Sequence, residues 1–171
     1  MIQDNIYKLL NEQVNKEIFS AYLYLDISNY YVDNGLDGFA NWFKIQAQEE
    51  MDHAMLFVQY MQNNGLSVKL TEIAGPEMEY LSYDLPLNEA LKHEQFITKS
   101  IHDIYDSASQ VKDYRTMQFL DWFIMEQGEE EKNAEDLILK YKNFGSDSKG
   151  LYLLNQELGT RIYAPPSLVL D

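Results

Sequence analysis

Four helical stretches of this sequence carry acidic or amide side chains on faces that are otherwise apolar. Over most of the chain, apolar residues recur three and four positions apart, a spacing that places them on one face of an α-helix. Strand patterns are almost absent. A carboxylate buried on such a face without a partner is destabilising or takes up a proton. A fold that buries all four faces must therefore supply these acids with a common partner.

The periodicity predicts four long helices. The first two run over about 4–33 and 37–64, and each ends at an Asn-Gly pair, where glycine accepts the left-handed conformation. Helical spacing then continues over 86–144, beginning at a proline that suits a first helical turn. Because one helix of that length is too long for this domain, we expect a break, for which Asp113 as an N-cap is the best candidate.

The segments between and after these helices predict a crossover and a short fifth helix. Residues 66–84 lack a helical pattern, yet they can span roughly 60 Å, whereas a helix of 28 residues is about 42 Å long. The segment can therefore run the length of a bundle. A short helix is expected at about 147–159 and an irregular tail at 160–171. The predicted fold is an all-α four-helix bundle (about 4–144) with one long crossover, forming a single domain over 1–171.

Composition narrows the class of protein. The chain has 171 residues and no cysteine, which fits one domain without disulfides or a zinc ribbon. No apolar run is long enough to span a membrane, and the start lacks the pattern of a secretory signal, so a cytoplasmic location is expected. The net charge of −15 argues against nucleic acid as a partner and is compatible with attraction of cations.

The polar positions of the four helices are spaced to lie level with one another. Glu17 precedes Glu50 by 33 positions, and Glu94 precedes Gln127 by the same 33. A shift of 77 positions relates the first pair to the second, which indicates an internal repeat of a helix pair. Because each pair is antiparallel with its turn about midway between the two members, all four side chains are expected at a similar depth.

This constellation predicts a metal site in the bundle core. Glu50 and His53 are three positions apart and therefore project from one helical face. Glu130 stands in the same relation to Gln127. Several carboxylates with one imidazole suit iron or manganese, and zinc as a competitor. The alternative is a purely structural network of polar side chains.

These residues and their flanking sequences resemble a known family, the ferritins, and specifically bacterial non-haem ferritin. The resemblance covers nearly the whole chain and rests on "FSAYLYL" after Glu17, "QAQEEMDHA", Glu94, "WFIMEQGEEE" and "KGLYLLNQEL". It implies a cytoplasmic shell of 24 subunits that oxidises Fe²⁺ with O₂ or H₂O₂. The ferric product would be stored as a hydrated oxide mineral in the central cavity.

The resemblance also implies roles for individual residues. The first iron would be bound by Glu17, Glu50 and His53, and Glu50 would bridge to a second iron held by Glu94 and Glu130. Gln127 would lie beside this dinuclear site, and Tyr24 would supply an electron. A third iron site on the cavity side would use Glu49, Glu126 and Glu129 together with Glu130.

Two departures qualify these expectations. The second half has Gln127-x-x-Glu130 in place of a second Glu-x-x-His, so the second iron site should be looser than the first. Met51 stands where bacterioferritin has its haem-ligating methionine, but a packing role is expected for it and no haem. His93 lies off the inner stripe, and we expect it on the surface or outside the ligand shell.

Two other functions remain open at this stage. The chain could be a non-catalytic subunit of a storage shell, which would keep acids on the cavity side but lack inward ligands. It could also be a di-iron oxidase or peroxidase that acts on another substrate, which would need a substrate cavity.

Overall fold

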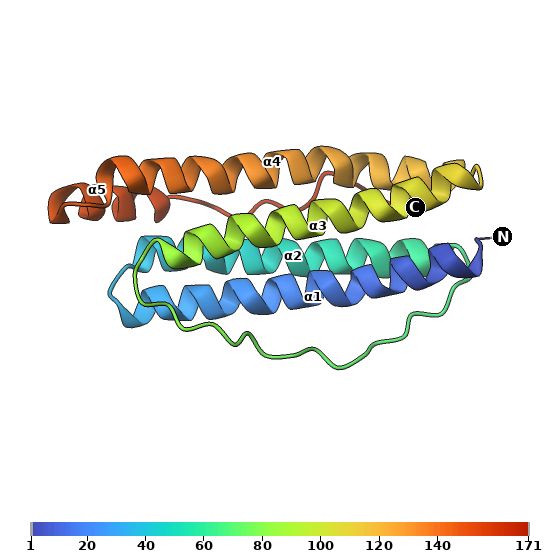
Figure 1. Ribbon diagram of the computed structural model, residues 1–171, viewed down its shortest axis with the longest axis horizontal. Helices are drawn as coiled ribbons and strands as arrows, with labels where there is room; N and C mark the ends of the chain where they lie inside the picture. Colours follow the sequence, from blue (N-terminus) through green and yellow to red (C-terminus); the bar gives the residue numbers. More distant parts are fainter. Residues whose placement is uncertain (1, 171) are drawn as a thin grey trace.

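A computed structural model describes residues 2–170 (Figure 1). Its helices are α1 (Asp4–Asp33), α2 (Asp37–Asn63), α3 (Leu85–Gln110), α4 (Tyr114–Phe144) and α5 (Ser148–Leu158). No strand occurs in the described range. The predicted fold class, a four-helix bundle with a short fifth helix, is confirmed. The first and last residues of the predicted domain, 1 and 171, lie outside the described residues.

Two antiparallel helix pairs, α1 with α2 and α3 with α4, are joined by one long crossover (Figure 1). The crossover, residues 64–84, returns along the whole bundle, so that α2 and α3 run in the same direction. It is tied to α1 by Asn11, whose Nδ2 donates to the Lys69 carbonyl oxygen (2.9 Å) and whose Oδ1 accepts from the Lys69 N–H (2.7 Å). These bonds satisfy backbone groups that the loop cannot pair internally.

The break between α3 and α4 lies at Asp113, as the sequence predicts. The Asp113 side chain accepts from the Thr116 backbone N–H at 3.2 Å and so caps α4. No glycine is available at this turn, and Lys112 takes the left-handed conformation instead, with φ of 59°. The two Asn-Gly turns use Gly35 and Gly65, with φ of 70° and 71°.

A polar layer divides the apolar core into two clusters. One cluster gathers the N-terminal half of α1 and the C-terminal half of α2, around Phe57 and Phe123. The other gathers the opposite halves of these helices, around Tyr31 and Phe43, together with α5. The buried polar side chains between the two clusters include Glu17, Glu50, His53, Glu94, Gln127 and Glu130. The apolar clusters therefore hold all four helices at fixed depth on both sides of the polar layer.

The short helix α5 docks against the start of α2. Asn155 Oδ1 accepts from the backbone N–H groups of Gly38 (2.8 Å) and Phe39 (3.2 Å), which are otherwise unpaired at a helix N-terminus. The two backbones approach so closely that a Cβ at Gly38 would lie 1.6 Å from the Asn155 carbonyl oxygen. Glycine is therefore required at this contact.

The chain after α5 runs back along the bundle beside α2 and α4 (Figure 1). Gln59 of α2 donates to the Leu170 carbonyl oxygen (2.8 Å), and Trp122 Nε1 of α4 donates to Ser167 Oγ (2.9 Å). Leu168 and Leu170 pack against the core cluster that contains Phe57. We call residues 160–170 the tail strap.

Within residues 2–170, no helix is both long enough and apolar enough to cross a membrane.

Replacing Gly38 with alanine should destabilise the protein, because the new methyl group collides with the α5 backbone. We expect a loss of roughly 1–3 kcal/mol, the usual range for overpacking. The matched control is Gly128→Ala in α4, where a Cβ meets no atom within 4 Å. This control should gain roughly 0.5–1 kcal/mol from helix propensity. Thermal unfolding of both variants tests the contact, and equal midpoints would contradict it.

Candidate metal centre

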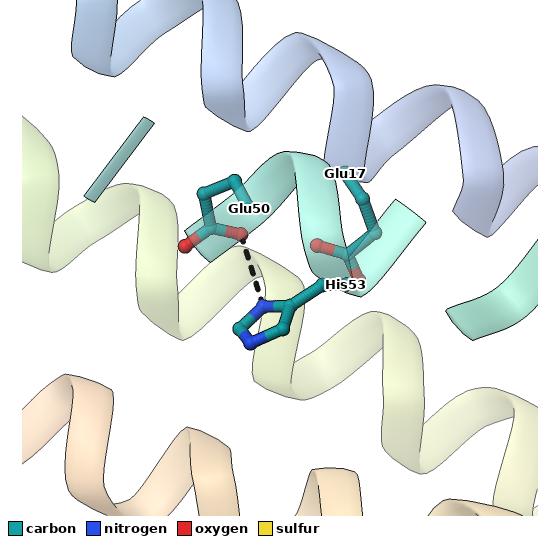
Figure 2. Close-up of side chains that lie close together, drawn as sticks. All are labelled: Glu17, Glu50 and His53. Carbon is teal, nitrogen blue, oxygen red and sulfur yellow. Dashed lines mark ion pairs between the residues drawn. The ribbon is translucent and has the colours of Figure 1, made fainter. Parts of the chain in front are cut away.

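Three side chains from α1 and α2 converge in the polar layer. Figure 2 shows Glu17 reaching from α1 toward Glu50 and His53 of α2. One ligand atom from each of these residues lies within 4.8 Å of the other two, and all three residues are buried. Glu50 and His53 face the same way because they are separated by three positions on one helix. We call this group the first cluster.

One carboxylate oxygen of Glu17 accepts a hydrogen bond, and the other has no partner in the described part of the chain. Its Oε1 accepts from Gln13 Nε2 at 2.7 Å, whereas its Oε2 is buried without a hydrogen-bond partner among residues 2–170. Burial, followed by the negative charge of Glu50, raises the pKa of Glu17 from its usual 4.5 to about 8. A cation near Oε2 would satisfy this oxygen and displace the proton.

His53 lies between two groups of acids. Its Nδ1 is 3.4 Å from Glu50 Oε2 within the first cluster (Figure 2), and its Nε2 is 3.8 Å from Glu126 Oε1 on the other side. His53, Glu126 and Glu130 form a second group whose ligand atoms lie within 4.8 Å of one another. An imidazole that binds a metal through one nitrogen often donates its other N–H to a carboxylate, which here would be Glu126.

Glu94 belongs to the same layer but is held differently. It accepts hydrogen bonds from the Tyr24 hydroxyl through Oε1 and from Gln127 Nε2 through Oε2, the latter at 3.0 Å. Burial and then the charge of Glu50 raise the pKa of Glu94 to about 8. Gln127 is thus a donor to Glu94 in this structure, and both of them lie outside the two groups described above.

Glu130 completes the layer from α4. It is buried, and burial followed by the charge of Glu94 raises its pKa to about 8. The pKa of Glu50 also rises well above its usual value, first through burial and then through the charge of Glu130. The acids of all four helices therefore influence one another, and each favours the uncharged form of its neighbours.

The residues expected to form a third site line the same cleft, but they differ in exposure and in their partners. Glu49, Glu126, Glu129 and Glu130 line a cleft of about 290 Å³, which is closed on one side by residues 164–167 of the tail strap. Glu126 and Glu130 belong to the group around His53. Glu129 lines the cleft but is exposed and takes part in neither group. Glu49 is paired with a cation of the protein itself.

That cation is Arg161 of the tail strap, a residue for which the sequence gives no signal. Its Nη2 lies 2.5 Å from Glu49 Oε2, its Nη1 donates to Gln46 Oε1 (2.9 Å), and its guanidinium lies 4.3 Å from the centre of the Trp42 ring. Burial raises the pKa of Glu49, and the charge of Arg161 opposes this rise. The pairing joins positions 112 residues apart in a segment without periodicity, so local sequence patterns cannot reveal it.

Of the two positions expected for His93, on the surface or outside the ligand shell, the structure has the second. Only 8% of His93 is exposed; its Nε2 is 2.8 Å from Ser20 Oγ, and its ring packs against Phe19 and Phe96. Burial lowers the pKa of His93 to about 4, so the ring is neutral. Ser20, 73 positions away, provides a partner that makes burial of the imidazole acceptable. His93 lies outside both groups of ligand atoms.

This arrangement can bind cations and release protons. Charged carboxylates repel one another in the core, so some of them keep a proton. When divalent ions replace these protons, burial of the charged carboxylates becomes favourable. The donor set, carboxylate oxygens with one imidazole, suits iron or manganese.

Comparisons with known proteins identify the family of the chain. The family model described as a ferritin-like domain matches residues 7–144. A bacterial non-heme ferritin of Campylobacter jejuni is 39% identical over 156 residues, covering 91% of this chain and 93% of that protein. One from Staphylococcus aureus is 35% identical and covers 95% and 98%. The structure of an open pore ferritin from Archaeoglobus fulgidus superposes with a TM-score of 0.92 at 39% identity, covering 95% of this chain and all of that one.

The raised pKa values predict how the metal-free protein responds to pH. Glu17, Glu94 and Glu130 bind protons more strongly when folded than when unfolded. Their contribution to stability is therefore complete below about pH 4.5 and is lost as the pH rises through about 8. In Glu17→Gln this loss is removed, so the variant should melt progressively higher than the parent from pH 5 to pH 8. Thermal unfolding across this range, with chelator present, is the measurement.

The matched control for this series is Glu12→Gln, on an exposed position of α1. Its difference from the parent should stay constant with pH. A constant difference for Glu17→Gln as well would contradict the assignment of a proton to this buried carboxyl.

Proposed function

We propose that this chain, which belongs to the ferritin-like family, is an iron-storage protein that oxidises Fe²⁺ at a dinuclear site within each subunit. The oxidant would be O₂ or H₂O₂, and the product a ferric oxyhydroxide mineral held in a shell cavity. The observation that carries the proposal is the convergence of Glu17, Glu50 and His53 in the dry core, with one oxygen of Glu17 left without a partner.

In this proposal the first Fe²⁺ is bound by Glu17, Glu50 and His53. Glu50 would bridge to a second Fe²⁺ held by Glu94 and Glu130. Anionic oxygen ligands stabilise Fe³⁺ relative to Fe²⁺, so this donor set favours loss of an electron. Binding displaces the protons that the buried acids hold without metal, and the apolar clusters on both sides limit the access of water.

Tyr24 and Gln127 would act on the second half of the site. Both donate to the Glu94 carboxylate and so fix its orientation. Burial and the charge of Glu94 raise the pKa of Tyr24 well above its usual value, so that the phenol keeps its proton. With a second ion bound to Glu94, this phenol would be able to give up an electron together with its proton.

A third ion would be held by Glu49, Glu126, Glu129 and Glu130 in the cleft under the tail strap. His53 connects the two sites, since its two nitrogens face Glu50 and Glu126. Ferric ions leaving the dinuclear site would find these carboxylates next. The pairing of Glu49 with Arg161 makes this site less negative, and hence weaker, than the acids alone would be.

The two other functions fit the structure less well. An oxidase for an organic substrate needs a mostly apolar pocket of several hundred Å³, whereas the cavity beside Glu94 and Glu130 has about 20 Å³, enough for a water-sized molecule. The larger cleft of about 290 Å³ is lined by Glu49, Glu126, Glu129 and Glu130, which suit a cation better than an organic molecule. A non-catalytic storage subunit does not need ligands in its core, yet the inward acids are present in all four helices.

We further propose that the chains assemble into a shell of 24 subunits in the cytoplasm, without haem, membrane or nucleic acid partners. Support for the shell comes from the family and from α5, whose exposed Tyr152 and Leu153 offer an apolar surface to a neighbouring subunit. Met51, which stands at the position of the haem-ligating methionine of bacterioferritin, is exposed on α2 within the single subunit.

Removing a ligand of the first cluster should slow iron oxidation. We expect Glu50→Ala and His53→Ala to lower the initial rate at least about tenfold, because each removes a direct ligand of the first ion. The measurement is the ferric absorbance after mixing Fe²⁺ with the aerobic metal-free protein. His102→Ala, at an exposed position of α3, is the control and should oxidise iron like the parent. Rates equal to the parent in both ligand variants would show that the site is wrongly assigned.

The assembly is tested by the mass of the protein in solution. A shell of 24 chains of 20.0 kDa has a mass of about 480 kDa. Size-exclusion chromatography with light scattering should give this value. A species of two or four chains would refute the shell and favour the oxidase alternative.

A further inference from the structure

A glutamine lies four positions before each of the two carboxylate ligands in the first cluster. Gln13 precedes Glu17 on α1, and Gln46 precedes Glu50 on α2. Four positions correspond to about one helical turn, so each glutamine lies directly beside its glutamate. Both glutamines are buried, Gln13 completely and Gln46 with 5% exposed.

Gln13 is the middle of a hydrogen-bonded chain that begins at a lysine. Lys16 Nζ donates to Ser100 Oγ (2.5 Å), Ser100 Oγ donates to Gln13 Oε1 (2.6 Å), and Gln13 Nε2 donates to Glu17 Oε1 (2.7 Å). An ammonium group has donors only, so the serine oxygen must accept from it and its hydrogen must point to Gln13. The amide N–H of Gln13 is then forced toward Glu17.

Gln46 is held in the same way by an arginine. Arg161 Nη1 donates to Gln46 Oε1 (2.9 Å), and Gln46 Nε2 donates to Glu50 Oε1 (3.2 Å). The guanidinium likewise has donors only, so it fixes the amide oxygen on its own side. The amide N–H of Gln46 is therefore turned toward Glu50. The tail strap thus reaches the core of the site through one side chain.

The second half of the bundle does not repeat this arrangement, and Glu94 is held instead by Tyr24 and Gln127. The shift of 77 that relates the two helix pairs places Ala90 at the position equivalent to Gln13, and Phe123 at the position equivalent to Gln46. Ala90 lines the cavity of about 20 Å³ beside Glu94, so space is left where α1 has an amide. Both carboxylates of the α1–α2 pair receive a fixed N–H at one oxygen, which leaves the other oxygen for a ligand role.

We propose that Gln13 and Gln46 are positioning residues that fix the Glu17 and Glu50 carboxylates for the first metal ion, each held in its donating orientation by a cation, Lys16 or Arg161. The inference rests on the proposed function, since it assumes that an ion binds to this cluster. It adds that the α1–α2 half is organised before the ion arrives and therefore binds first. In the α3–α4 half, both Glu94 oxygens accept hydrogen bonds, from Tyr24 and Gln127, so one of these bonds must give way to the second ion.

The test measures binding of Co²⁺, followed by its visible absorption, to the assembled metal-free protein. Gln13→Met and Gln46→Met retain volume but remove the donor. Each should weaken the first equivalent of Co²⁺ about tenfold to a hundredfold, the effect of losing one hydrogen bond to a charged group. The second equivalent should be unchanged in Gln13→Met and should weaken less than the first in Gln46→Met, because Glu50 would bridge both ions. Gln48→Met, at an exposed position of α2, is the matched control and should bind like the parent.

A double-mutant cycle tests the role of the cation. If Arg161 acts through Gln46, then Arg161→Met should weaken the first equivalent, and the Gln46→Met/Arg161→Met double variant should be no weaker than Gln46→Met alone. Arg161→Lys keeps a donor and should retain most of the affinity. Arg115→Met, which removes an arginine bound to Asn64 at an exposed position, is the control. Additive losses of affinity would mean that Arg161 acts only through Glu49. This result would refute the proposed series of hydrogen bonds from Arg161 through Gln46 to Glu50.

Three results separate the inference from the proposed function. If the parent binds no Co²⁺, or His53→Ala binds both equivalents normally, the metal site itself is wrong. If the parent and His53→Ala differ as expected but both glutamine variants bind like Gln48→Met, only the positioning role is refuted. If both equivalents weaken together and the metal-free glutamine variants also melt well below the control, the glutamines are structural, which also refutes positioning.

Discussion

Mutual repulsion among buried carboxylates is the constraint on which the rest of this structure depends. Glu17, Glu50, Glu94 and Glu130 lie in one layer of the bundle, and each raises the pKa of another. Without a cation, the layer is tolerable only because protons remain on some of these acids. The two apolar clusters above and below the layer provide the stability that keeps the acids in place. The bundle therefore holds together a group of side chains that would separate if they were free.

The two halves of the layer resolve this repulsion in different ways. In the α1–α2 half, the amide of a neighbouring glutamine holds one oxygen of each carboxylate. In the α3–α4 half, Glu94 relies on Tyr24 and Gln127, which come from two different helices. A helix pair that is repeated in sequence has thus become chemically unequal. One half leaves an oxygen of each carboxylate outside the amide bonds, whereas both oxygens of Glu94 accept hydrogen bonds. Such a difference suits the proposed function, in which the ferric product must leave the site.

Helical periodicity was sufficient to predict the bundle, the crossover and the inward position of the polar residues. These features depend on spacing within single helices, which the sequence displays directly. The contacts that escaped prediction join distant segments. Arg161 meets Glu49 across 112 positions, and His93 meets Ser20 across 73, and neither residue lies in a pattern that names its partner. Gln13 and Gln46 lie on the predicted faces. The sequence does not show, however, that Lys16 and Arg161 fix the orientation of their amide groups.

The location of the first cluster has a consequence for the order in which the site forms as the chain is made. Glu17, Glu50 and His53 all belong to α1 and α2, which end at Asn63, so pairing of the first two helices is enough to bring these ligands together. Glu94 and Glu130 join only after the crossover has been synthesised. Arg161 follows last, because its partners Glu49 and Gln46 precede it by 112 and 115 positions. A growing chain therefore carries the three residues of the first cluster long before it carries the countercharge of Arg161.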